Sequence, residues 1–149
     1  LKKLDFVHPV LQNFYVGGNY TWSASNIQLT PQNLTAQTTN DRPLQGHSAQ
    51  IFNFQIGYDN PAWKTQATLL YNISSKRIMA AGVLGAPDKY EQPVHQLDFV
   101  LSQNLYKGLS MQASMQNLLD DDIRITQGDE VTRQYRRGRF FNLSVRLAY

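Results

Sequence analysis

The sequence predicts an all-β fold, an antiparallel transmembrane β-barrel segment of about six long strands plus a partial one. Apolar and polar residues alternate over six long stretches, and the connections between these stretches are alternately long and short. A strand with period 2 places one set of side chains on each face of its sheet. We therefore expect residues 1–149 to form one partial domain. Its sheet should have one face in contact with lipid and the other in contact with a polar lumen.

Composition excludes several other classes of protein. Hydrophobic residues make up 42% of the 149 residues and charged residues only 17%, below the roughly 25% of soluble domains. No run approaches the ~20 apolar residues of a membrane helix, whereas barrel strands keep the average hydropathy low because they alternate. The mean hydropathy is −0.43. There is no cysteine, which excludes disulfides and Cys-type zinc sites. The net charge of +3 comes from scattered Lys and Arg without a nucleic-acid motif, so no nucleic-acid partner is expected.

The strands follow one another in a regular order. The opening stretch from Leu1 to Val7 already alternates, so we expect it to end a strand that begins upstream and the chain to be a fragment. Tight turns are predicted at 59–61, where Asp and Asn precede Pro, and at 106–108, where Tyr and Lys precede Gly. Loops are predicted at about 26–46, 79–92 and 127–137. The six long strands, at about 11–18 residues, exceed the ~9–11 that cross a bilayer at a tilt. They are predicted at about 13–25, 47–58, 62–78, 93–105, 109–126 and 138–149.

Aromatic residues are spaced as two girdles would require. Eight positions separate Phe14 from Trp22, Trp63 from Tyr71, and Phe141 from Tyr149. Eight tilted residues climb about 20 Å, close to the ~25 Å apolar band of a membrane barrel. The girdle prediction rests on Phe14, Trp22, Tyr58, Trp63 and Tyr71.

The polar face must meet water or protein, because a charge in lipid costs a few kcal/mol. Lys64, Asp98, Arg124 and Arg146 are candidate lumen charges, either paired with a plug or simply solvated. A shared dry interior around Trp22, Leu69, Phe99 and Leu143 would contradict this orientation. A basic group near the outer strand ends could contact anionic head groups; it comprises Lys76, Arg77, Arg136, Arg137 and Arg139.

Several motifs together resemble the C-terminal end of a TonB-dependent outer-membrane receptor, over essentially the whole chain. They are the run from Asn13 to Trp22, Gly57 to Pro61 with Leu69 to Asn72, Tyr90 to Asp98, Gln116 to Asp120, and Tyr135 to Tyr149. The terminal strand is also similar to the signal read by the outer-membrane assembly machinery. That signal is carried here by Gly138, Phe141, Leu143, Val145, Leu147 and Tyr149.

The resemblance implies a 22-stranded barrel in the outer membrane of a Gram-negative bacterium. It also implies partners: membrane lipid, the rest of the barrel with its plug domain, and TonB through a segment that precedes this chain. The expected activity is transport of a scarce nutrient such as an iron–siderophore complex, with no cofactor. The identity of the transported ligand is left open.

No catalytic or metal site is expected. His8, His47 and His95 lie in different hairpins without ligand spacing, and Asp120, Asp121 and Asp122 lack the glycine pattern of a calcium loop. Two alternatives remain beside the receptor. One is an autonomous eight-stranded barrel with a structural or adhesion role, and the other is a soluble lipocalin-like binding module. An enzyme ranks last.

Overall fold

The computed structural model describes residues 2–4, 8, 11–29, 37–106 and 108–147. Its described residues form antiparallel β-sheets and contain no α-helix, so the all-β prediction is confirmed. The sheets are open and do not close into a barrel. Within these residues, no helix is both long enough and apolar enough to cross a membrane.

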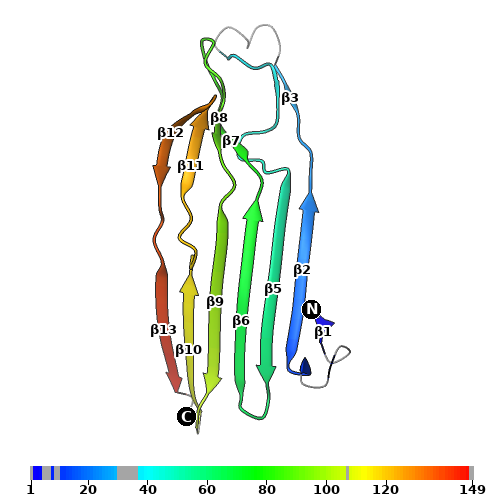
Figure 1. Cartoon of the computed structure of the whole chain (residues 1–149), viewed down its shortest axis with the longest axis vertical. Helices are drawn as coiled ribbons and strands as arrows, with labels where there is room; N and C mark the ends of the chain where they lie inside the picture. Colours follow the sequence, from blue (N-terminus) through cyan, green and yellow to red (C-terminus); the bar gives the residue numbers. More distant parts are fainter. Residues whose placement is uncertain (1, 5–7, 9–10, 30–36, 107, 148–149) are drawn as a thin grey trace.

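The main sheet has seven strands in the order β1-β2-β5-β6-β9-β10-β13 (Figure 1). Each strand is antiparallel to its neighbours, so the chain runs up and down across the sheet. Six strands are long and one is short, as the sequence predicts. Their bounds are β1 Lys2–Lys3, β2 Phe14–Trp22, β5 Gln50–Asn60, β6 Thr65–Ser74, β9 His95–Asn104, β10 Leu109–Gln116 and β13 Phe140–Leu147.

A second sheet lies beyond one end of the main sheet, opposite the short turns, and we call it the distal sheet (Figure 1). It has the order β12-β11-β8-β7, in which β7 follows β6, β8 precedes β9, β11 follows β10 and β12 precedes β13. A separate two-stranded sheet, β3 with β4, lies between β2 and β5 in the chain. The bounds are β3 Ile27–Gln28, β4 Asp41–Arg42, β7 Arg77–Ala80, β8 Lys89–Glu91, β11 Ile123–Gln127 and β12 Glu130–Tyr135.

Two predicted strands were too long, and the distal sheet explains why. The stretch 109–126 divides into β10 and β11 because Asn117 and Asp120 take positive φ values of 57° and 49°. The stretch 62–78 starts only at Thr65 and breaks at Ser75 and Lys76. Short strands lie within the predicted loops: β3 and β4 within 26–46, β8 within 79–92, and β12 within 127–137.

Cross-strand register sorts the main sheet into two faces, because directly opposed side chains share a face. The pairs Phe14–Tyr58, Phe54–Tyr71 and Leu69–Phe99 illustrate the first, the apolar face. The apolar face also carries Val16, Phe52, Ile56, Ala67, Leu101, Met111, Ala113, Met115, Phe141, Leu143, Val145 and Leu147. The polar face carries Tyr15, Asn19, Asn53, Gln55, Thr68, Asn72, Gln96, Asp98, Ser102, Gln112, Ser114, Asn142, Ser144 and Arg146.

A buried hydrophobic core is found only in the distal sheet. Among the described residues, the buried hydrophobic side chains are Ile78, Ile123 and Ile125, exposed by 1%, 1% and 3%. Within the described ranges, no second layer of strands packs on the apolar face of the main sheet.

Candidate functional site

Strand β5 shows the polarity of the main sheet most directly. Its apolar side chains Phe52, Phe54 and Ile56 are 40%, 38% and 40% exposed. The polar residues that alternate with them, Asn53 and Gln55, are less exposed. A strand of a water-soluble protein normally buries its apolar side chains and exposes the polar ones. The candidate functional feature is thus the pair of faces, with the exposed one apolar.

The side chains that would share a dry interior in a soluble fold stay apart in this sheet. Trp22 lies at the end of β2 and is 70% exposed, and Leu143 on β13 is 65% exposed. Leu69 and Phe99 are cross-strand neighbours on the apolar face, with Leu69 37% exposed. No common core joins these four residues.

The predicted aromatic residues form groups at two levels of the apolar face. Phe14 and Trp22 are the first and last residues of β2. At the short-turn end the rings of Phe14 and Tyr58 lie 5.1 Å apart. At the other end the rings of Phe52 and Tyr71 lie 6.4 Å apart.

Trp63 departs from its predicted position on a strand. It lies in the turn at 61–64, where Lys64 has a φ of 50°, and its side chain is 71% exposed. The turn still places this residue at the short-turn end of the sheet.

A hollow of about 400 Å³ opens on the polar face over β2, β5, β6 and β9. Four of its lining residues stand directly opposite one another and form what we call the amide rung: Asn19, Asn53, Asn72 and Gln96. Asn53 donates its side-chain Nδ2–H to Asn19 Oδ1 at 2.7 Å, and Asn72 donates in the same direction to Asn53 Oδ1. The side-chain amides of Asn72 and Asn53 therefore both donate toward β2.

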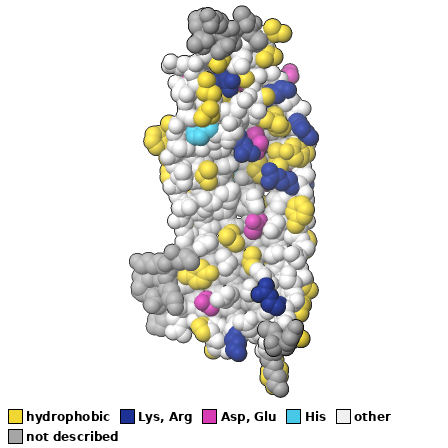
Figure 2. All heavy atoms as spheres, turned by 180° about the vertical axis from the view of Figure 1, so that it is seen from behind, with side chains coloured by type: hydrophobic (Ala, Val, Ile, Leu, Met, Phe, Trp, Pro, Cys, Tyr) yellow, Lys and Arg dark blue, Asp and Glu magenta, His cyan; other side chains and the backbone are white. Residues whose placement is uncertain are grey.

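A neighbouring row completes the hollow, and we call it the second rung: Gly17, Gln55, Leu70 and Asp98, again directly opposed. Asp98 accepts a hydrogen bond from the backbone N–H of Asn117 at 2.8 Å and one from Gln96 Nε2 at 3.1 Å. Figure 2 shows this side of the molecule, where white polar side chains and backbone dominate the middle of the main sheet and hydrophobic ones are scattered.

The four candidate lumen charges lie in different places. Asp98 and Arg146 lie on the polar face, and Arg146 lines a second, smaller hollow beside Ser110 and Ser144. Lys64 lies in the 61–64 turn rather than on a strand, because its positive φ bends the chain there. Arg124 lies on β11 of the distal sheet and is exposed, because the predicted strand breaks at Asn117.

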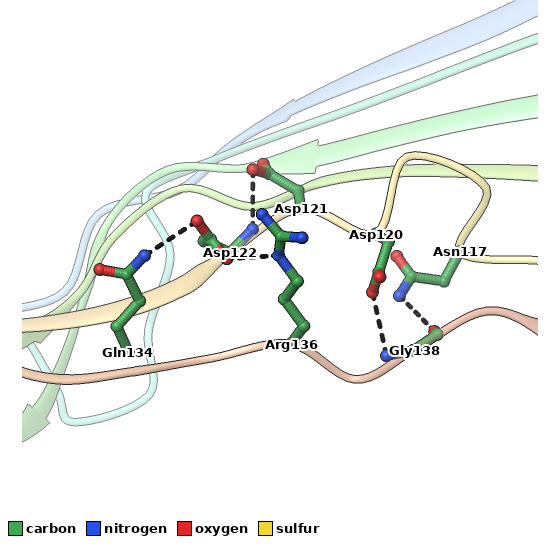
Figure 3. Close-up of polar contacts among 7 residues, drawn as sticks. All are labelled: Asn117, Asp120, Asp121, Asp122, Gln134, Arg136 and Gly138. Carbon is green, nitrogen blue, oxygen red and sulfur yellow. Dashed lines mark hydrogen bonds and ion pairs between the residues drawn. The ribbon is translucent and has the colours of Figure 1, made fainter.

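The predicted assembly signal is divided between a strand and a turn. Phe141, Leu143, Val145 and Leu147 lie on the apolar face of β13 and are at least 64% exposed, while Tyr149 lies outside the described residues. Gly138 precedes β13 with a φ of 83°. Its N–H donates to Asp120 Oδ1 at 3.0 Å, and its carbonyl oxygen accepts from Asn117 Nδ2 at 2.7 Å (Figure 3).

An ion pair follows these contacts where the distal sheet begins. Arg136 Nε lies 2.7 Å from Asp122 Oδ1, and Gln134 Nε2 donates to the other carboxylate oxygen at 2.9 Å (Figure 3). The hydrogen bond from Arg136 holds the pKa of Asp122 below its usual value, although partial desolvation opposes the shift. The same hydrogen bond raises the pKa of Arg136.

Three other residues of the predicted basic group make separate contacts, and the fourth, Arg137, is exposed. Arg77 forms an ion pair with Glu91 at 2.8 Å, and the ammonium of Lys76 lies 5.2 Å from the centre of the Tyr90 ring. Arg139 donates from Nε to the backbone oxygen of Leu118 at 2.9 Å. Their charges are distributed along the distal end and do not converge on one point.

The histidines bind neighbouring side chains. His47 hydrogen-bonds with the hydroxyls of Ser23 and Ser25 at 2.8 and 2.9 Å, and His95 with the Tyr71 hydroxyl at 2.6 Å. In the described ranges, no three His, Cys, Asp or Glu side chains lie close enough together to hold a metal ion.

Sequence reasoning missed the hollow because it depends on register. The polar position of Asn19, Asn53 and Asn72 within each strand was readable, but their alignment across strands is set by the turns. Leu70 was missed as well, because it interrupts the polar positions of its strand. Comparison with known proteins adds nothing here: no family model, curated protein or solved structure matches the chain.

Proposed function

We propose that the chain forms part of the wall of a transmembrane β-barrel in a bacterial outer membrane. In this arrangement the apolar face meets acyl chains and the polar face meets the lumen. The observation that carries the proposal is the exposure of Phe52, Phe54 and Ile56 on β5 beside better-covered Asn53 and Gln55. Water would oppose this arrangement by roughly 25 cal/mol for each Å² of apolar surface, whereas lipid removes that cost.

The edges of the main sheet support a larger barrel. In the part of the chain that the structure describes, strand β13 pairs only with β10, and its eight residues are all exposed. An unpaired backbone group in hydrocarbon costs several kcal/mol, so an open edge cannot stay in lipid. Seven strands, one of them only two residues long, are also fewer than the roughly eight of the smallest barrels. Further strands would have to complete the wall.

Within this class we favour the C-terminal part of a TonB-dependent receptor, on the basis of the sequence motifs between Asn13 and Tyr149. On this proposal the chain supplies wall, loops and closing strand to an active transporter. A plug and a TonB-contacting segment would belong to the same receptor. Uptake of an iron–siderophore complex or a similar large nutrient follows from family analogy alone.

Cysteine labelling tests the orientation of the two faces. Cysteines replacing Phe54 and Leu69 should react with a lipid-soluble maleimide in membranes, and cysteines replacing Asn53 and Leu70 with a water-soluble one. The chain has no native cysteine to interfere. The two positions compared, 53 with 54 and 69 with 70, are adjacent in sequence, so chain mobility is matched within each pair.

The rival functions give other patterns. In a soluble lipocalin-like module the water-soluble reagent would reach Asn53→Cys, neither reagent would reach Phe54→Cys, and the chain would need no detergent. That result would refute the membrane proposal. An autonomous small barrel would give the same labelling, but the purified chain alone would migrate as a compact, heat-modifiable monomer.

A further inference from the structure

The hollow on the polar face has an acceptor-rich end that the role of a barrel wall does not require. In the amide rung, Asn72 donates to Asn53 and Asn53 donates to Asn19, on β2. Asn72 is the last asparagine of this series, and its Oδ1 atom receives no hydrogen bond from a described residue. Gln96, directly opposite, turns its donor to Asp98 and leaves Oε1 unbonded within the described part of the chain. Two residues with unbonded amide oxygens and one carboxylate residue thus line the hollow on neighbouring positions of β6 and β9.

Asp98 is the one charged residue that lines this hollow, and its charge is not neutralised by a described side chain. It is held in place by the Asn117 N–H and by Gln96, both of which are neutral donors. A carboxylate beside amide oxygens favours a partner that carries several N–H donors and a positive charge.

Leu70 adds an apolar surface next to this charge. It stands directly opposite Asp98, is 37% exposed, and lies on a face that is otherwise mainly polar. Val100 lies on the same face, two residues further along β9. Opposed side chains on a sheet have Cβ atoms about 5 Å apart, which is close to the length of a short methylene chain.

We propose that this hollow binds a protonated aliphatic amine, either a free alkylamine or the aminoalkyl arm of a larger solute. The ammonium contacts Asp98 and the oxygens of Asn72 and Gln96, and the methylene groups lie on Leu70. This inference rests on the proposed function, since it requires the polar face to border an accessible aqueous lumen. The volume of about 400 Å³ falls within the range of small-molecule sites, ~300–1,000 Å³.

A matched pair of probes tests the proposal by titration calorimetry of the complete protein in a neutral detergent at about 0.1 M salt. Putrescine (1,4-diaminobutane) should bind, and 1,4-butanediol, of the same length but without charge, should bind at least about ten-fold more weakly. Asp98→Asn should weaken putrescine binding roughly ten-fold while keeping an oxygen for the Asn117 N–H. Asn72→Leu, which removes an acceptor without touching Asp98, should weaken it several-fold.

Asp59→Asn is the control, because Asp59 lies on the same face outside the hollow. Four residues along β5 and two strands place it about 16 Å from Asp98, beyond the ~10 Å Debye length, so affinity should stay within about two-fold. Equal binding of the diol, or equal effects of Asp98→Asn and Asp59→Asn, would overturn the inference. So would no putrescine binding, the result expected if a basic side chain of the same protein fills the hollow. The cysteine labelling pattern would be unaffected by any of these outcomes, so the two proposals can fail separately.

Discussion

At the scale of single residues, the contact between Tyr15 and Gly57 shows how the polar face of the sheet is packed. The two residues are directly opposed on β2 and β5, and the Tyr15 ring lies across the space where a Gly57 side chain would be. The ring passes over the glycine to reach β6, where its hydroxyl hydrogen-bonds with Thr68 Oγ1 at 3.2 Å. Only a residue without a Cβ permits this arrangement.

Replacing Gly57 by alanine should therefore destabilise the sheet. The new Cβ would overlap the Tyr15 ring and force it off its path, at a cost of about 1–3 kcal/mol. Urea unfolding in detergent micelles, followed by circular dichroism, measures the effect. In a Tyr15→Ala background the same substitution should cost much less, because the ring is gone. An equal cost in both backgrounds would show that the contact is not the cause.

The sequence could assign most of these residues to a face but not to a partner. Asp98 was predicted from alternation alone to lie on the polar side, as it does. Gln96, two residues earlier on the same strand, follows from the same alternation. The cross-strand neighbour Leu70 could not be predicted, because a shift of one residue in register would bring another side chain opposite Asp98. Lys64 was misplaced because its neighbours alternate as a strand does, while its positive φ belongs to a turn.

At the scale of elements, the breaks between the main and distal sheets depend on polar residues with unusual backbone conformations. Asn117 and Asp120 take positive φ values that asparagine and aspartate tolerate better than most residues. Both side chains then bind Gly138, which leads into β13. The two strands of this hairpin consequently leave the main sheet at the same level.

The ion pair between Asp122 and Arg136 should make the start of the distal sheet sensitive to acid. The folded state lowers the pKa of Asp122, so its stabilising contribution is complete above the ordinary carboxyl pKa of about 4. That contribution is lost as the pH falls through the lowered value. Hydrogen exchange of the β12 amides at neutral pH and near pH 3 should show a few-fold loss of protection on acidification, modest because the pair is exposed.

The Asp122→Asn variant is the test of that assignment. It should exchange faster than the wild type at neutral pH and show less change on acidification. Asp129→Asn, in the turn between β11 and β12, is the control, because no described side chain pairs with the Asp129 carboxylate. Identical pH dependence in the wild type and in Asp122→Asn would contradict the role of the pair.

The six long strands and the tight turn after Asn60 were predictable because alternation and Pro61 mark them locally. The breaks were not, because the segments on either side of 117–122 both alternate. Positive φ at Asn117 leaves only a weak trace in the sequence. Strand β12 was also missed, because four of the six residues of Glu130–Tyr135 are polar. The segment forms a strand by pairing with β11, whose Ile123 and Ile125 are buried.

At the scale of the whole molecule, the strands of the main sheet are held together by backbone hydrogen bonds between neighbouring strands and not by a hydrophobic core. The described apolar residues of this sheet have no second layer, and the buried isoleucines all belong to the distal sheet. A single sheet in water would have little to offset the entropy of ordering its chain. The balance changes if a second solvent covers the apolar face, because that solvent then takes the place of a core.

Leu69 and Leu70 allow the environments of the two faces to be compared with one residue type. They are adjacent on β6, each is 37% exposed, and they lie on the apolar and polar faces respectively. In a bilayer Leu69→Arg should cost about 2–4 kcal/mol, the penalty for arginine near the midplane of a barrel wall, and Leu70→Arg should cost far less. Equilibrium refolding of each variant into lipid vesicles gives the two free energies. Because the exposures are equal, a sheet with water on both sides predicts equal effects, and that result would rule out lipid as the solvent of the apolar face.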